Sequence, residues 1–167
     1  KTEEQETEKI EDISVSEAVS NAQFSHLHCH SQFSILQSTS TTQHLVDSAV
    51  KHEMPAIAMT DHGNMMGAFH FVKSALKAGV KPIVGCEFNL CVDRHDKSHK
   101  DDGYHCVLLA KNKKGYHNLC KLASYAYTEG FYYVPRIDRE VLLEYKEDLI
   151  ALSGVMWGEI AHKTLNI

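Results

Sequence analysis

Short apolar runs alternate with amphipathic stretches along most of this chain. Buried strands are predicted at 56–59, 82–88, 105–110 and 149–152. Apolar residues at helical spacing predict helices at about 42–53, 69–76, 114–127 and 139–145, and a further helix begins near 159. Strands that alternate with helices predict an α/β fold, either a barrel or a doubly wound sheet, with the functional site at one rim.

Local signals support several of these elements. The hydroxyl residues 40–42 offer an N-cap to the first helix, and Asp138 offers one to the helix at 139–145. Gly79 is placed to end the second helix. In that helix Phe69, Val72 and Leu76 are expected to form the apolar face.

The segment 24–30 predicts a short strand that ends in alternating histidines. Period-2 geometry places His26, His28 and His30 on one face of such a strand. Each imidazole has two ring nitrogens to satisfy, so three aligned rings are costly to bury without proton acceptors or a metal. Imidazole ligands suit zinc, manganese or iron, and this spacing therefore favours a metal site.

Other polar residues stand at the ends of later strands. Asp61 and His62 follow the strand at 56–59, and Glu87 is a carboxylate within an apolar run, where a charge needs a partner or a metal. His105 lies at the start of its strand. In a strictly parallel sheet the start of a strand lies at the wrong end for this site. The strand therefore either runs against its neighbour, or local geometry brings the histidine back to the site. His95 and His99, in the charged loop 93–103, are expected to face solvent.

Composition limits the function classes. The 167 residues are 43% hydrophobic and 23% charged, which is typical of one globular domain. The net charge of −5 provides no global basic field for nucleic acid. The five cysteines form no Cys-x-x-Cys pair and no run of membrane length occurs, so a reduced, cytoplasmic protein is expected.

The chain is expected to be a piece of a longer protein. It opens on Lys1 and stops soon after a helix begins. Residues 1–22 are rich in acids and predict a flexible acidic linker, and residues 23–167 predict an incomplete domain.

Several motifs resemble the polymerase-and-histidinol-phosphatase (PHP) family, and more narrowly the PHP domains at the amino-terminal part of bacterial DNA polymerase III alpha subunits. The family motifs are His28-x-His30, Thr60-Asp61-His62-Gly63-Asn64 and Gly85-Cys86-Glu87. The narrower match rests on the segments 58–65, 81–87, 108–112 and 129–138. The resemblance runs from Phe24 to the end of the chain.

The resemblance implies a distorted (βα)7 barrel, truncated at its carboxyl-terminal side in this chain, with up to three metal ions at the rim. It implies these metal ligands: His28, His30, His62, Glu87 and His105. His26 is adjacent to the motif but outside the ligand set. Two ligand positions are degenerate, because Gln37 replaces an acid and Val155 replaces a cysteine. The closing Asp-x-His motif is also missing, so incomplete loading with zinc or manganese is expected.

The preferred interpretation is a structural scaffold within a replicative polymerase that synthesises DNA on a template. The polymerase site, its magnesium ions and its catalytic residues would then lie outside these residues. Partners would be DNA, deoxynucleotides, a proofreading exonuclease and a sliding clamp. Two alternatives stay open, an active metal-dependent phosphoesterase or 3′–5′ exonuclease, and a free-standing small-molecule phosphatase such as a histidinol phosphatase. The aromatic segment 131–133 is either a packing surface for the rest of the polymerase or part of the core.

Overall fold

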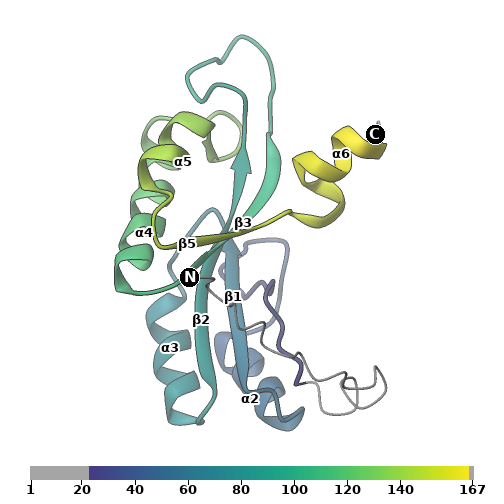
Figure 1. The fold of residues 1–167 in the computed structure, drawn as a ribbon, viewed down its shortest axis with the longest axis vertical. Coiled ribbons are helices and arrows are strands. Elements are labelled where there is room, and N and C mark those ends of the chain that lie inside the picture. The colour runs from purple at the N-terminus through teal and green to yellow at the C-terminus, as the bar shows by residue number, and fades with distance from the viewer. Residues whose placement is uncertain (1–22, 166–167) are drawn as a thin grey trace, which may run out of the picture.

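A mixed sheet is the centre of the computed structural model, which describes residues 23–165 (Figure 1). Four strands follow one another across the sheet in the order β1-β2-β3-β5, and the short β4 pairs with β2 beyond the end of β1. The strands are β1 (Ala56–His62), β2 (Lys81–Leu90), β3 (Tyr104–Ala110), β4 (Arg136–Ile137) and β5 (Leu149–Leu152). The predicted acidic linker at 1–22 lies outside the described residues.

Strand direction resolves the question raised by His105. β1 and β2 are parallel, whereas β3 runs antiparallel to β2. The start of β3 therefore lies beside the end of β2, in register with Asn89. The first of the two alternatives, a strand that runs against its neighbour, is confirmed.

The predicted strand at 24–30 is wrong as a regular strand, although its backbone follows β1. Ala58 donates its N–H to the carbonyl of His26, and Thr60 donates to the carbonyl of Cys29. Apart from these two bonds no regular ladder forms, and residues 24–30 contain no strand. The segment still fixes the histidines beside the outer edge of β1.

The helices cover the sheet unevenly. In Figure 1, α3, α4 and α5 lie along one side of the strands, whereas α6 extends away on the other. The helices are α2 (Thr42–Lys51), α3 (Ala68–Lys77), α4 (Lys113–Thr128), α5 (Arg139–Tyr145) and α6 (Glu159–Leu165), with a short 3₁₀ turn, η1 (Val155–Trp157), before α6.

The predicted helix ends are confirmed. The side chain of Thr41 accepts the N–H of His44 at the start of α2, and Asp138 accepts the N–H of Val141 at the start of α5. Gly79 follows the end of α3 with a φ of 75°, a left-handed backbone that suits glycine.

Two apolar clusters form the core. One packs α2 and α3 against β1 through residues such as Val46, Ile57 and Phe71. The other packs α4 and α5 against β2 and β3 through residues such as Phe88 and Leu122. All five of these side chains are at most 2% exposed. This packing leaves the strand ends that lie away from the two apolar clusters free to carry polar groups.

Two details of the predicted core are wrong. α3 buries Ala68, Phe71 and Ala75, while Phe69 is 74% and Leu76 65% exposed. The small alanines let the helix approach the sheet closely, and periodicity had favoured the larger residues. β5 is also less buried than predicted, with Ile150 45% exposed, since among the described strands it pairs with β3 alone.

The described strands form a five-stranded sheet within a mixed α/β fold. The closed (βα)7 barrel stays a prediction. None of the described helices has the length and apolar character needed to cross a membrane.

Candidate metal centre

Glu87 is the centre of the histidine cluster. It lies in β2 directly opposite His62 of β1, and its carboxylate is only 2% exposed. Three imidazoles from two other segments surround it. Their nitrogens lie 3.4 Å (His28 Nε2), 2.7 Å (His30 Nε2) and 2.9 Å (His105 Nδ1) from the nearest carboxylate oxygen. The tertiary fold thus brings four of the five predicted ligands together.

The two carboxylate oxygens of Glu87 have different partners. Oε1 accepts a hydrogen bond from Nδ1 of His105, while Oε2 faces Nε2 of His30. Burial alone raises the pKa of Glu87, but the facing imidazoles of His105, His28 and His30 outweigh it and hold that pKa well below its usual range. The same hydrogen bond to Glu87 raises the pKa of His105, against the effect of burial. The site therefore contains a carboxylate under ordinary conditions.

His30 carries the observation that bears on metal binding. Its Nε2 atom is buried and, among the described residues, has no hydrogen-bond partner of suitable geometry, although Oε2 of Glu87 is only 2.7 Å away. A buried imidazole nitrogen without a partner is costly. A divalent ion between these two atoms would satisfy both, so the residues present fit a metal.

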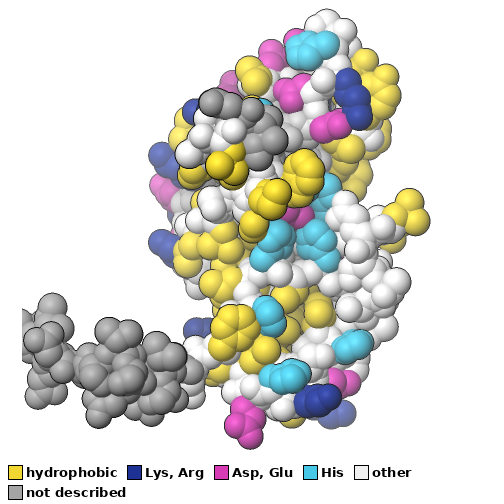
Figure 2. Space-filling model, turned by 90° about the vertical axis from the view of Figure 1, so that its right-hand side faces the viewer, with side chains coloured by type: hydrophobic (Ala, Val, Ile, Leu, Met, Phe, Trp, Pro, Cys, Tyr) yellow, Lys and Arg dark blue, Asp and Glu magenta, His cyan; other side chains and the backbone are white. Residues whose placement is uncertain are grey.

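The candidate ligand atoms come from His28, His30 and Glu87 and lie within 4.8 Å of one another. Two histidines and one carboxylate are a donor set that zinc uses in proteins, with a further position open. The side chains of His28 and His30 are 31% and 22% exposed, so solvent reaches this part of the cluster. Figure 2 shows histidine side chains gathered around an acidic group near the middle of this face.

His62 is placed differently. Its Nδ1 lies 2.7 Å from the amide nitrogen of Gln37, and its Nε2 lies 3.1 Å from the amide oxygen of Asn89. Its ring centroid is 5.4 Å from that of His105. Burial lowers the pKa of His62 more than the bond to Asn89 raises it, which favours the neutral ring.

Asp61 supports the loop that carries the histidines, a role that sequence reasoning missed. It is 1% exposed and accepts three hydrogen bonds, from the backbone N–H and hydroxyl of Ser31 and from the hydroxyl of Ser34. Because Ser31 directly follows His30, this carboxylate fixes the course of the chain at the site. Its position one residue before His62 was the available signal.

The remaining predicted positions are not part of the His28, His30 and Glu87 ligand group. His26 is exposed and packs edge-on against Phe24. Val155 begins η1, is 68% exposed and offers no ligand atom. His95 and His99 are exposed, as predicted.

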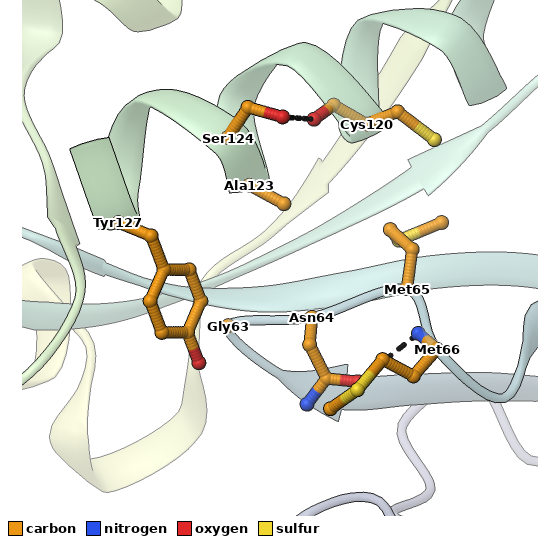
Figure 3. Close-up of a pocket in the computed structure, with 8 residues that line it drawn as sticks. All are labelled: Gly63, Asn64, Met65, Met66, Cys120, Ala123, Ser124 and Tyr127. Atoms are coloured by element: carbon orange, nitrogen blue, oxygen red, sulfur yellow. Dashed lines mark hydrogen bonds between the residues drawn. The ribbon is translucent and has the colours of Figure 1, made fainter.

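A separate cavity of about 500 Å³ lies between the loop after β1 and α4 (Figure 3). Its walls are mainly apolar, with Met65, Met66 and Tyr127 among them. Two hydrogen bonds join residues of the wall: the hydroxyl of Ser124 donates to the carbonyl of Cys120, and the N–H of Met66 donates to the side-chain oxygen of Asn64. No histidine or carboxylate lines this cavity, so it is distinct from the histidine cluster around Glu87.

Comparisons with known proteins show the family of this chain. The profile of the PHP domain matches residues 26–166. The chain is 47% identical over 143 residues to DNA polymerase III subunit alpha of Chlamydia trachomatis, and 49% identical over 148 residues to DNA polymerase III subunit alpha of Thermus aquaticus. The alignments cover 83% and 84% of this chain, and this chain spans 12% of each relative.

Among solved structures, one from Bifidobacterium adolescentis described as a metal-dependent phosphoesterase gives a TM-score of 0.48. Its sequence is 22% identical, and the match covers 63% of this chain and 33% of that chain. A likeness this weak carries no argument about function. The family match extends over most of the chain, and the chain belongs to the PHP domain family.

Proposed function

We propose that this chain is the amino-terminal PHP domain of a bacterial DNA polymerase III alpha subunit. The supporting observation is the identity of 47% over 143 residues to a relative of that name. Because the chain spans only 12% of that relative, the whole protein's reaction, DNA-templated DNA synthesis, is part of the proposal. Its polymerase site and magnesium ions would lie outside these residues.

The site around Glu87, here called the rim site, would hold one or more divalent ions, zinc or manganese. His28, His30 and Glu87 supply the ligand atoms that lie closest together, and His105 holds the second oxygen of Glu87 in place. When bound, such an ion can polarise a phosphoester. The protein's own part is to orient a charged carboxylate beside the imidazole nitrogens of His28 and His30.

The domain would act mainly as a scaffold, within the distorted (βα)7 barrel predicted for the complete domain. Two predicted ligand positions, Gln37 and Val155, bring no negative charge, so attraction for further ions is weak. The aromatic segment at 131–133 supports a docking role: Phe131 is 47% and Tyr133 65% exposed, which contradicts the core alternative for these two rings.

The partners and location of the domain would be those of the proposed whole polymerase subunit. Partners would be DNA and deoxynucleotides through the whole polymerase, together with a proofreading exonuclease and a sliding clamp. The location would be the cytoplasm. Residues 1–22 would be the linker that precedes the domain at 23–167.

The experiment compares the full-length protein with its His30→Ala variant. Under the scaffold proposal both extend a DNA primer at rates within about twofold, and neither removes 3′ nucleotides in a chelator-sensitive way. The exposed His44, in α2, gives the matched control His44→Ala. Absence of primer extension by the intact wild-type protein would reject the polymerase assignment.

An active phosphoesterase or 3′–5′ exonuclease is the second candidate, and the partial exposure of His28 and His30 to solvent favours it. Removal of 3′ nucleotides by the wild-type protein that EDTA and His30→Ala both abolish would establish this candidate. Hydrolysis of histidinol phosphate without primer extension would instead support the third alternative, a free-standing phosphatase.

A further inference from the structure

His62 is the one predicted ligand whose two ring nitrogens both face side-chain amides. Gln37 approaches Nδ1 at 2.7 Å, and Asn89 approaches Nε2 at 3.1 Å. A metal ligand needs an imidazole nitrogen with a free lone pair directed at the ion. His62 can therefore coordinate an ion only if one of these contacts breaks.

The direction of the hydrogen bonds fixes which ring nitrogen of His62 carries the proton. The amide nitrogen of Asn89 donates to the carbonyl of Pro135 at 3.1 Å, so its oxygen must face His62. That oxygen can only accept, and Nε2 of His62 must then carry the proton. In the neutral ring Nδ1 is consequently an acceptor, and it receives the N–H of Gln37.

This chain of bonds begins at a backbone carbonyl and ends on Gln37 without a mismatched donor or acceptor. Its neighbour His30 contrasts with it, since the buried Nε2 atom there has no partner of suitable geometry among the described residues. One histidine of the rim is thus satisfied without a metal, and the other is not. The two have different roles.

We propose that His62 is a hydrogen-bonded strut between Gln37 and Asn89 rather than a metal ligand, and that the rim holds a single divalent ion at His28, His30 and Glu87. The inference rests on the metal site proposed above and narrows it. The strut connects the loop at 31–38 to the end of β2, and it holds that loop beside the ion site without contributing a ligand. A single ion has no second metal partner for a two-ion displacement, which agrees with a scaffold role.

The first test reads the ring of His62 by histidine-selective ¹⁵N NMR on the intact chain. The resonance is assigned by its loss in His62→Gln. Without metal we expect the Nε2–H tautomer, and one equivalent of zinc should shift His28 and His30 and leave His62 unchanged. A large zinc-dependent shift of the His62 Nδ1 resonance would overturn the proposal, as would an Nδ1–H ring in the metal-free chain.

The second test counts zinc by mass spectrometry after equilibrium dialysis. We expect one equivalent of zinc in the wild type and one in His62→Gln, whose zinc affinity should fall less than about tenfold. We expect less than roughly 0.2 equivalents in His30→Ala, because that change removes a direct ligand. His44→Ala is the control, since His44 is exposed in α2. Two equivalents in the wild type that fall to one in His62→Gln would refute the single-ion site.

The two readouts separate the strut from the metal site. If the wild type binds no zinc, the proposed metal site and the single ion both fail. The metal-free tautomer of His62 still decides the strut, because those hydrogen bonds need no ion. If zinc binds and the tautomer is wrong, the metal site stands and the strut does not.

Discussion

The Oε2 atom of Glu87 lies 2.7 Å from Nε2 of His30, yet the two atoms make no hydrogen bond of suitable geometry. This short distance places a buried carboxylate next to a buried imidazole nitrogen that lacks a hydrogen-bond partner among the described residues. A metal ion placed between them would resolve it, since the ion accepts an electron pair from both.

Replacing Glu87 by Gln should abolish tight zinc binding. The change removes the one carboxylate of the ligand group, and we expect affinity to fall by more than about 100-fold, the upper end of the loss caused by removing an outer partner of a ligand. Competition with a chromophoric chelator measures it. The control Glu144→Gln alters an exposed carboxylate in α5 and should have no effect. Unchanged affinity in Glu87→Gln would place the ion elsewhere.

His105 should give the metal-free chain a pH-dependent stability. Its pKa is raised in the fold by the hydrogen bond to Glu87, so it stabilises fully below its unfolded pKa of about 6.5, and this contribution is lost as pH rises through the higher folded value. His62, whose pKa is lowered, acts in the opposite sense.

The variant His105→Gln isolates that contribution. In urea unfolding with EDTA, the stability difference between wild type and variant should shrink from about pH 6 to about pH 8.5. The matched change His95→Gln, at an exposed loop position, should give a flat profile. A difference that grows with pH would show that His105 is not the proton-linked partner of Glu87.

Asp61→Ala should loosen the histidine loop. The change leaves the N–H of Ser31 without its acceptor, and hydrogen bonds to a charged group contribute about 1.5–3 kcal/mol each. We expect a loss of about 3 kcal/mol in the free energy of unfolding and about tenfold weaker zinc binding. Asp47→Ala, exposed in α2, is the control. Equal zinc affinity in both variants would mean that the loop holds its course without Asp61.

Asp138→Ala should lower the free energy of unfolding, although Asp138 is outside the candidate metal centre. Asp138 caps α5 and receives a guanidinium nitrogen of Arg94 at 2.9 Å on each oxygen. Its pKa is lowered because the hydrogen bonds from Val141 and Arg94 outweigh burial. Removing it leaves a buried cation without this partner, and we expect a loss of about 3 kcal/mol in urea unfolding.

A matched variant uses the same arginine. Glu140 also contacts Arg94, at 3.0 Å, but its side chain is 80% exposed. Glu140→Ala should therefore cost less than about 1 kcal/mol. If both variants lost equal stability, burial would not be the reason for the strength of the Asp138 pair.

Local sequence signals were enough to predict the alternation of elements and most of their ends. Apolar runs predicted β1, β2 and β3, and Thr41 and Asp138 predicted caps that the structure confirms. These signals are local, since a strand or a cap depends on residues a few positions apart. Larger side chains misled the prediction in α3, where small alanines pack against the sheet.

Which residues share the site depends on contacts between segments that are distant in the sequence. Spacing alone could not show that β3 reverses direction and brings His105 to Glu87, nor that Asp61 holds the loop after His30. The resemblance to the family likewise implied five candidate ligands without distinguishing among them. Hydrogen bonds between distant segments separated them, because a nitrogen already paired with an amide and a nitrogen left without a partner look identical in a sequence.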